Sequence, residues 1–193
     1  MNRTAVSAVL GAFSLFAAAP TASAQALTES VPPTAAEPHN AMKALDALHG
    51  EWTSLTEMRG QDGEWQTFSK DLVVFEPLVS GLLLAERHVE RISGAGFVLL
   101  TSFSYDQYRD LYRTSVVDET FGLMDIYEGD AKDDVLTMTN LRSGTSFPTD
   151  DGEMFFKLRI PLTGDTRVMD VDVSTDKGET WAPLYRMTYE RAG

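Results

Sequence analysis

From Gly50 onward, apolar and polar residues alternate in short runs, and a turn signal follows each run. A period of two residues is typical of β-strands that are buried on one side only. Ten such runs follow one another, and no second helical segment of any length interrupts them. The runs cover residues 52–58, 65–75, 82–92, 97–105, 112–117, 123–127, 135–139, 154–160, 167–173 and 184–191.

A series of sequential strands predicts an antiparallel meander. Such a sheet either closes on itself or leaves two edges that can pair with other chains. We therefore expect an all-β fold, an up-and-down antiparallel β-barrel of about ten strands, with a two-sheet sandwich as the second choice. Residues 41–48 carry apolar residues at helical spacing, with Asn40 as the expected N-cap. This short helix is expected to cover one end of the barrel.

The first 24 residues have the pattern of a secretory signal peptide. Arg3 precedes an apolar run over residues 6–19, and Ala22-Ser23-Ala24 supplies a small-residue cleavage pattern. The alternative is a retained membrane anchor, but the run is shorter than the roughly 20 residues that a spanning helix needs. The expected organisation is a signal peptide over 1–24, a flexible proline-containing tether over 25–39 and a barrel domain over 40–193. The protein is then exported, to the periplasm or outside the cell.

Charge and cysteine content exclude several classes of function. The formal net charge is −13, so nucleic acids and anionic lipid surfaces would be repelled, and no membrane partner is expected after signal removal. There are no cysteines, which excludes disulfides, cysteine zinc sites and thiol catalysis. The sequence leaves the oligomeric state open.

Three local patterns resemble a known family. They are Gly50-Glu51-Trp52 at the first strand, Tyr105-Asp106 in the middle, and the segment from Asp176-Lys177-Gly178 through Trp181 to Tyr189-Glu190-Arg191. Together, over about residues 42–193, they resemble an uncharacterised bacterial family of secreted lipocalin-like (calycin) β-barrel proteins, known as a domain of unknown function. The resemblance implies a barrel and assigns no activity.

Haem-binding barrels of the same fold group carry an axial histidine late in the chain. The histidines of this sequence are His39, His49 and His88, so that arrangement has no counterpart here. We expect no cofactor. The three histidines also lie in a tether, a helix end and a strand, so no metal site is expected.

Trp52 and Arg191 are expected to be structural. In small barrels a tryptophan at this position plugs one end, and a late arginine stacks on its ring through a cation–π interaction. The alternative is that Trp52 lines a ligand site.

Glu86 and His88 form the most prominent polar pair. They lie two positions apart on one strand, so their side chains share a face. If that face is interior, they hold a proton or orient a polar ligand; if it is exterior, they are an ordinary solvated pair. We expect the interior arrangement, with Arg113 fixed by Glu86 and with Tyr105 in reach. Glu86→Gln is then expected to weaken both folding and ligand capture.

The remaining interior is apolar and aromatic. The side chains expected to line it are Phe103, Tyr105, Tyr127, Phe156, Tyr185 and Tyr189. This mixture suits one small hydrophobic or amphipathic molecule, bound without catalysis and without catalytic residues. The alternatives are an acid–base enzyme of the isomerase, cyclase or hydratase type, and a protein-interaction module with a solid core.

Overall fold

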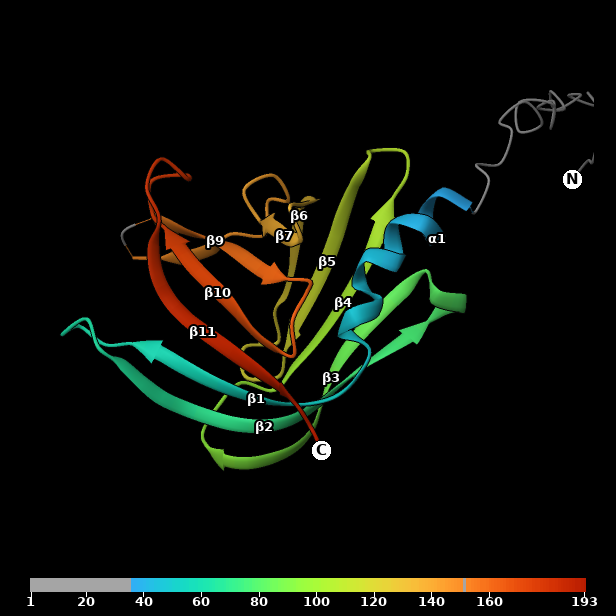
Figure 1. Cartoon of the computed structure of the whole chain (residues 1–193). Helices are drawn as coiled ribbons and strands as arrows, with labels where there is room; N and C mark the ends of the chain where they lie inside the picture. Colours follow the sequence, from blue (N-terminus) through green and yellow to red (C-terminus); the bar gives the residue numbers. More distant parts are fainter. Residues whose placement is uncertain (1–35, 151) are drawn as a thin grey trace, which may run out of the picture. The chain divides into compact units, whose positions relative to one another are not determined.

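The computed structural model describes residues 36–150 and 152–193 (Figure 1). The expected signal peptide and residues 25–35 of the expected tether lie outside the described residues. Among the helices that are described, none is long and apolar enough to cross a membrane.

The N-terminal helix begins earlier than the sequence predicts. Helix α1 (Ala36–Met42) continues directly into the 3₁₀ helix η2 (Lys43–Leu48), so the last residues of the expected tether are helical. Pro38 lies in the first turn, where a missing N–H breaks no helical hydrogen bond. Asn40 is therefore not an N-cap: it lies inside α1, and its Oδ1 accepts a hydrogen bond from Nζ of Lys43 at 3.2 Å.

The strands follow the alternating runs closely. They are β1 (Gly50–Arg59), β2 (Trp65–Leu78), β3 (Leu83–Gly94), β4 (Leu99–Asp106), β5 (Leu111–Asp118), β6 (Met124–Lys132), β7 (Val135–Thr139), β8 (Phe147–Thr149), β9 (Gly152–Pro161), β10 (Thr166–Ser174) and β11 (Ala182–Arg191), with a one-turn 3₁₀ helix η3 (Val79–Gly81) between β2 and β3. The strand that the sequence does not predict is β8, a three-residue segment that pairs with β9.

The expected closed barrel is confirmed. Neighbouring strands pair antiparallel in chain order, β9 follows β7, and β10 pairs with β9. The ring closes where β11 pairs with β1, with Trp52 opposite Arg191. Ten strands thus form the barrel, and β8 lies outside the ring as an addition to β9.

Along most of the ring, alternate residues of a strand point into the barrel, as the period of two requires, and the register shifts in the β1–β2, β2–β3 and β10–β11 pairs. On β4, for example, Thr101 and Phe103 are buried while Leu100 is half exposed. The buried side chains form one core with the helical segment, which contributes Met42, Leu45 and Leu48.

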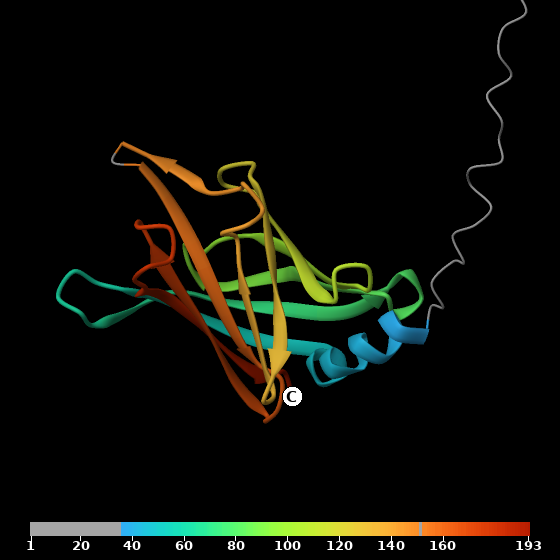
Figure 2. The ribbon, with the colours of Figure 1, turned by 90° about the horizontal axis from the view of Figure 1, so that it is seen from above.

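The two ends of the barrel differ. In both views the tip of the β1–β2 hairpin and helix α1 lie at opposite ends (Figures 1 and 2). At the helical end, Leu45 and Leu48 are buried in the core, and the Tyr112 hydroxyl donates to the backbone oxygen of Ala41 at 2.7 Å. The short helix therefore covers one end, as expected.

Candidate functional site

A cavity of about 330 Å³ opens at the end of the barrel away from η2. Its place follows from β1: Met58, near the far end of this strand, lines the cavity, whereas Trp52 at the other end contacts η2. We call this cavity the outer chamber. Its lining is mostly aliphatic and aromatic: Met58, Phe97, Leu99, Val116, Asp118, Phe121, Leu123, Asp125, Tyr127, Phe147, Met154, Phe156, Leu184 and Tyr185.

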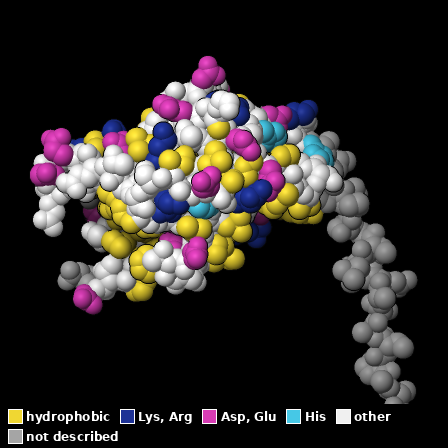
Figure 3. Space-filling view, turned by 90° about the horizontal axis from the view of Figure 1, so that it is seen from below, with side chains coloured by type: hydrophobic (Ala, Val, Ile, Leu, Met, Phe, Trp, Pro, Cys, Tyr) yellow, Lys and Arg dark blue, Asp and Glu magenta, His cyan; other side chains and the backbone are white. Residues whose placement is uncertain are grey.

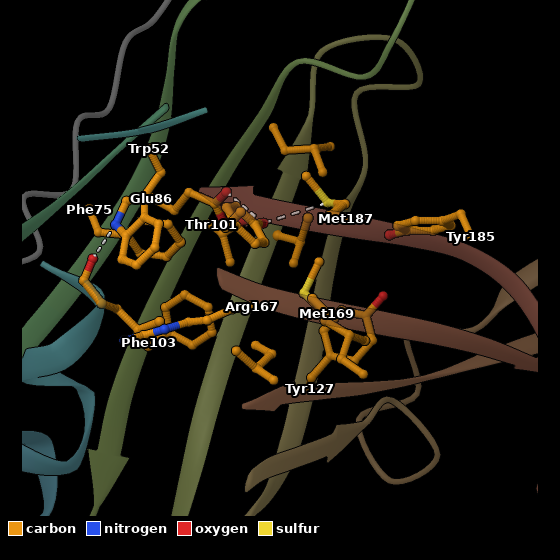
Figure 4. Close-up of a pocket in the computed structure, with 16 residues that line it drawn as sticks. Trp52, Phe75, Glu86, Thr101, Phe103, Tyr127, Arg167, Met169, Tyr185 and Met187 are labelled. Carbon is orange, nitrogen blue, oxygen red and sulfur yellow. Dashed lines mark hydrogen bonds between the residues drawn. The ribbon is translucent and has the colours of Figure 1, made fainter. Parts of the chain in front are cut away.

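A second, smaller space of about 30 Å³ lies deeper in the barrel. This inner chamber reaches Leu48 and Trp52 at the closed end and also contains Glu86 and Arg167 (Figure 4). Four residues line both chambers: Leu99, Val116, Tyr127 and Tyr185. The two chambers are therefore adjacent along the barrel axis, and the inner one has room for about one or two water-sized groups.

Glu86 projects from β3 into the inner chamber and is buried. Its carboxylate accepts a hydrogen bond from the Tyr189 hydroxyl at 2.9 Å. Burial raises the pKa of Glu86 from 4.5 to about 7, and the hydrogen bonds from Tyr189 and Thr101 only partly oppose that shift. The inner chamber therefore holds a carboxyl group that is neutral in a large part of the molecules near pH 7.

The four aromatic side chains Phe103, Tyr127, Tyr185 and Tyr189 lie where the sequence places them, along the inner chamber. Burial raises the pKa of the Tyr127, Tyr185 and Tyr189 hydroxyls above the ordinary value. These hydroxyls therefore remain protonated and serve as neutral hydrogen-bonding groups.

Trp52 closes the inner chamber at the helical end. Its Nε1 donates to the backbone oxygen of Leu48 at 2.7 Å, and the Arg191 guanidinium lies 3.9 Å from its ring centroid. Arg191 also donates to the backbone oxygens of His49 and Ala47. Trp52 thus both plugs the barrel and lines the chamber.

His88 shares the interior face with Glu86 but has a different partner. Its Nε2 lies 3.1 Å from Oδ1 of Asp71 on β2. Asp71 is buried and also accepts hydrogen bonds from Ser69 and Arg91. Asp71 was not predicted as a site residue, although it lies two positions after Ser69 on β2 and so shares a face with it.

Arg113 does not reach Glu86, so this part of the expected site is wrong. Its neighbours Tyr112 and Thr114 take the interior positions of β5, which turns Arg113 outward. There its side chain is 41% exposed, and Nε lies 3.3 Å from Glu128 Oε1 on β6. Glu86 consequently has no cationic partner from β5.

Tyr105 does not reach the chambers either. It points to the helical end of the barrel, where its ring packs edge-on against Tyr112 and its hydroxyl donates to Asp110. It lies two interior positions beyond Thr101, on the far side of Phe103. The expectation that Tyr105 and Glu86 share one space is therefore wrong.

Two of the charged residues that line the chambers, Arg167 and Asp125, were not predicted as site residues. Arg167 precedes Met169 and Val171 at two-residue steps on β10, so the alternation of that strand was sufficient to place it inside. Asp125 is buried at the outer chamber, where it accepts hydrogen bonds from Asn140 and Thr145. Both partners come from the loop that follows β7, a pairing that the sequence does not indicate.

No group of three or more histidine or acidic side chains in the described part of the chain is arranged to hold a metal ion.

The ring of ten strands, the covered end and the chambers define a lipocalin-like, up-and-down antiparallel β-barrel. The chain belongs to the family described as "Protein of unknown function (DUF1579)", whose model matches residues 37–191. This confirms the resemblance to a family of unknown function. A search of curated proteins finds no match.

Proposed function

We propose that this protein is an exported barrel that binds one small hydrophobic or amphipathic molecule through its open end, without catalysis. The observation that carries the proposal is the outer chamber, whose volume of about 330 Å³ lies within the size range of small-molecule pockets. Its lining favours a hydrocarbon ligand, because each methylene removed from water contributes about 0.8 kcal/mol.

The test uses a neutral fluorescent probe, N-phenyl-1-naphthylamine, whose emission rises in apolar surroundings. Val116→Trp fills the junction of the two chambers, whereas Val117→Trp places the same ring on the outer face of the same strand. We expect saturable binding to the wild type and to Val117→Trp, and a loss of roughly ten-fold or more in affinity for Val116→Trp.

Absence of saturable binding to the wild-type protein would instead support the solid interaction module. An equal loss in both variants would show that the probe binds outside the chambers. Native mass spectrometry of the protein purified from its natural host, after export, then identifies the molecule that co-purifies and the mature N-terminus.

An acid–base enzyme is the second candidate, because Glu86 can exchange a proton near neutral pH. The space beside this carboxyl is only about 30 Å³, so it admits an end group and not the body of a substrate. This favours the first candidate, a binding protein without catalysis, which we call the container. Incubating the co-purified molecule with the protein and following it by NMR separates the two functions. An unchanged spectrum supports the container, and a new product supports the enzyme.

A further inference from the structure

Arg167 on β10 is a buried cation with unfulfilled hydrogen-bonding capacity. It is 4% exposed, and its Nε donates to the backbone oxygen of Gly164 at 3.1 Å. Its Nη1 is buried and has no hydrogen-bond partner among the described residues. Burying a charged group without a partner is costly, so such a site favours an anion from outside the chain.

The Trp52 ring offsets part of that cost, while the nearby positive charge of Arg191 adds to it. Its guanidinium lies 4.9 Å from the Trp52 ring centroid, and Arg191 stacks on the same ring at 3.9 Å. Burial and the nearby Arg191 charge both lower the pKa of Arg167, while the exposed Asp165 acts in the opposite direction. The cation–π contact is thus shared between two arginines, and within the described residues no carboxylate forms an ion pair with Arg167.

Arg167 lines the inner chamber, which shares four lining residues with the outer one. Figure 4 shows Arg167 on the same side as Trp52 and Phe103, while Tyr127 and Tyr185 lie toward the other side. A molecule that enters through the open end therefore meets hydrocarbon first and a cation last.

The acidic groups of the outer chamber are already hydrogen-bonded. Asp118 accepts from the backbone N–H groups of Thr120 and Phe121, and Asp125 from Asn140 and Thr145. These carboxylates therefore need no cationic ligand, whereas the guanidinium at the far end lacks a partner. The charge pattern favours a ligand with its anionic end innermost.

Building on the function proposed above, we infer that the ligand is a linear aliphatic monocarboxylate. Its carboxylate lies in the inner chamber and accepts a hydrogen bond from Nη1 of Arg167, and its hydrocarbon chain fills the outer chamber. The volumes of the two chambers favour this class of ligand. The inner chamber, about 30 Å³, accepts a small end group, and the outer chamber, about 330 Å³, accepts a flexible chain. Neutral Glu86 adds a second polar group in the same chamber.

The first test compares three ten-carbon ligands on the wild-type protein by isothermal titration calorimetry at pH 6. The ligands are decanoate, decan-1-ol and decyltrimethylammonium, which share a tail and differ in the charge of the end group. We expect decanoate to bind roughly ten- to a hundred-fold more tightly than decan-1-ol, because its charge-assisted hydrogen bond forms in a buried site.

The second test removes the cation. Arg167→Met should reduce decanoate affinity to that of decan-1-ol while leaving decan-1-ol binding unchanged. Arg159→Met is the matched control, because Arg159 is exposed on the outer face of β9 and pairs with Asp170 and Asp172. It should leave all three affinities unchanged. If Arg167→Met does not fold, the comparison of the three ligands on the wild-type protein still tests whether the site prefers a carboxylate.

The outcomes separate the two proposals. Equal affinity of the wild type for decanoate and decan-1-ol overturns the carboxylate assignment and leaves the container intact. Tightest binding of the ammonium compound also overturns it, and points to the carboxylates of the outer chamber. Failure of all three ligands to bind overturns the container itself.

Discussion

Glu86 is an acidic group surrounded mainly by hydrocarbon. The groups that hydrogen-bond to it are neutral, namely Tyr189 and Thr101, and the arginine expected to face it lies on the outside of the barrel. Its protonation is therefore set by burial rather than by an ion pair. This reverses the expected effect of removing its charge.

Glu86→Gln should stabilise the protein at alkaline pH. The folded protein holds the Glu86 proton more tightly than the unfolded chain, so wild-type stability decreases as pH rises from 4.5 to about 7 and stays lowered above that. A shift of this size corresponds to about 3 kcal/mol. We expect the variant to exceed the wild type by up to about that amount at pH 8 and to match it near pH 4.5. Urea unfolding at a series of pH values measures the difference.

Arg87→Gln is the control on the same strand. Arg87 points outward and pairs with Glu76 at 2.8 Å on an exposed surface, so its loss should change stability by less than about 1 kcal/mol at either pH. If Glu86→Gln were destabilising at pH 8, Glu86 would need a cationic partner that the geometry does not provide.

At the scale of single elements, η2 and the start of β1 form one unit. Trp52 and Arg191 each donate hydrogen bonds to backbone oxygens of the last turn of η2, at 2.7 and 2.9 Å for the bonds to Leu48 and Ala47. Gly50 makes this approach possible: its φ is +111°, and a Cβ there would lie 2.8 Å from Nη1 of Arg191. The Gly-x-Trp motif therefore has a physical reason.

Trp52→Phe should loosen the covered end. The variant loses the Nε1 hydrogen bond and leaves a void in the core, at a cost of about 2–4 kcal/mol. Trp65→Phe is the control, because Trp65 is only partly buried and lies under Arg59 and Arg186 at the surface. Thermal unfolding should separate the two variants, and equal losses would contradict the role of Trp52 as the plug.

The strands were predictable because each obeys one local rule, alternation between turns. β7 has the predicted bounds, and β8 was hidden because three residues around Pro148 carry no alternation. The rule that alternate residues of a strand share a face correctly placed Glu86 inside the barrel. For Arg113 the same rule did not show which face of β5 is interior, because both faces carry apolar residues: Tyr112 and Val116 on one, and Leu111 and Val117 on the other. The partner of His88 depends on β2–β3 register, which the sequence does not display.

At the scale of the whole molecule, charges of both signs are interspersed on the surface with hydrophobic side chains between them (Figure 3). On this face, the Asp and Glu side chains are therefore spread out and do not form one continuous acidic patch. Closure of the ring gives each of its ten strands a hydrogen-bonded neighbour on both sides, whereas β8 pairs with β9 alone.

Removing residues 182–193, which contain β11, should cause the protein to associate with itself. Without β11, the strands β1 and β10 each lose a partner and expose hydrogen-bonding edges. We expect oligomers and higher species in size-exclusion chromatography. A chain that ends at Arg191 keeps β11 and should elute as the full-length protein does. If the variant without residues 182–193 were monomeric and unfolded cooperatively, the pairing of β1 with β11 would not be needed to close the barrel.

The seam between β1 and β11 also sets when the domain can fold. It pairs residues that are far apart in the chain, such as Trp52 and Arg191. Contacts of such long range are formed slowly, because the entropy of closing the loop is lost before they form. During translation, β11 must emerge from the ribosome before β1 can have a partner on both sides, β2 on one and β11 on the other. The barrel therefore closes only after β11 has been synthesised, and a shorter nascent chain retains an open sheet.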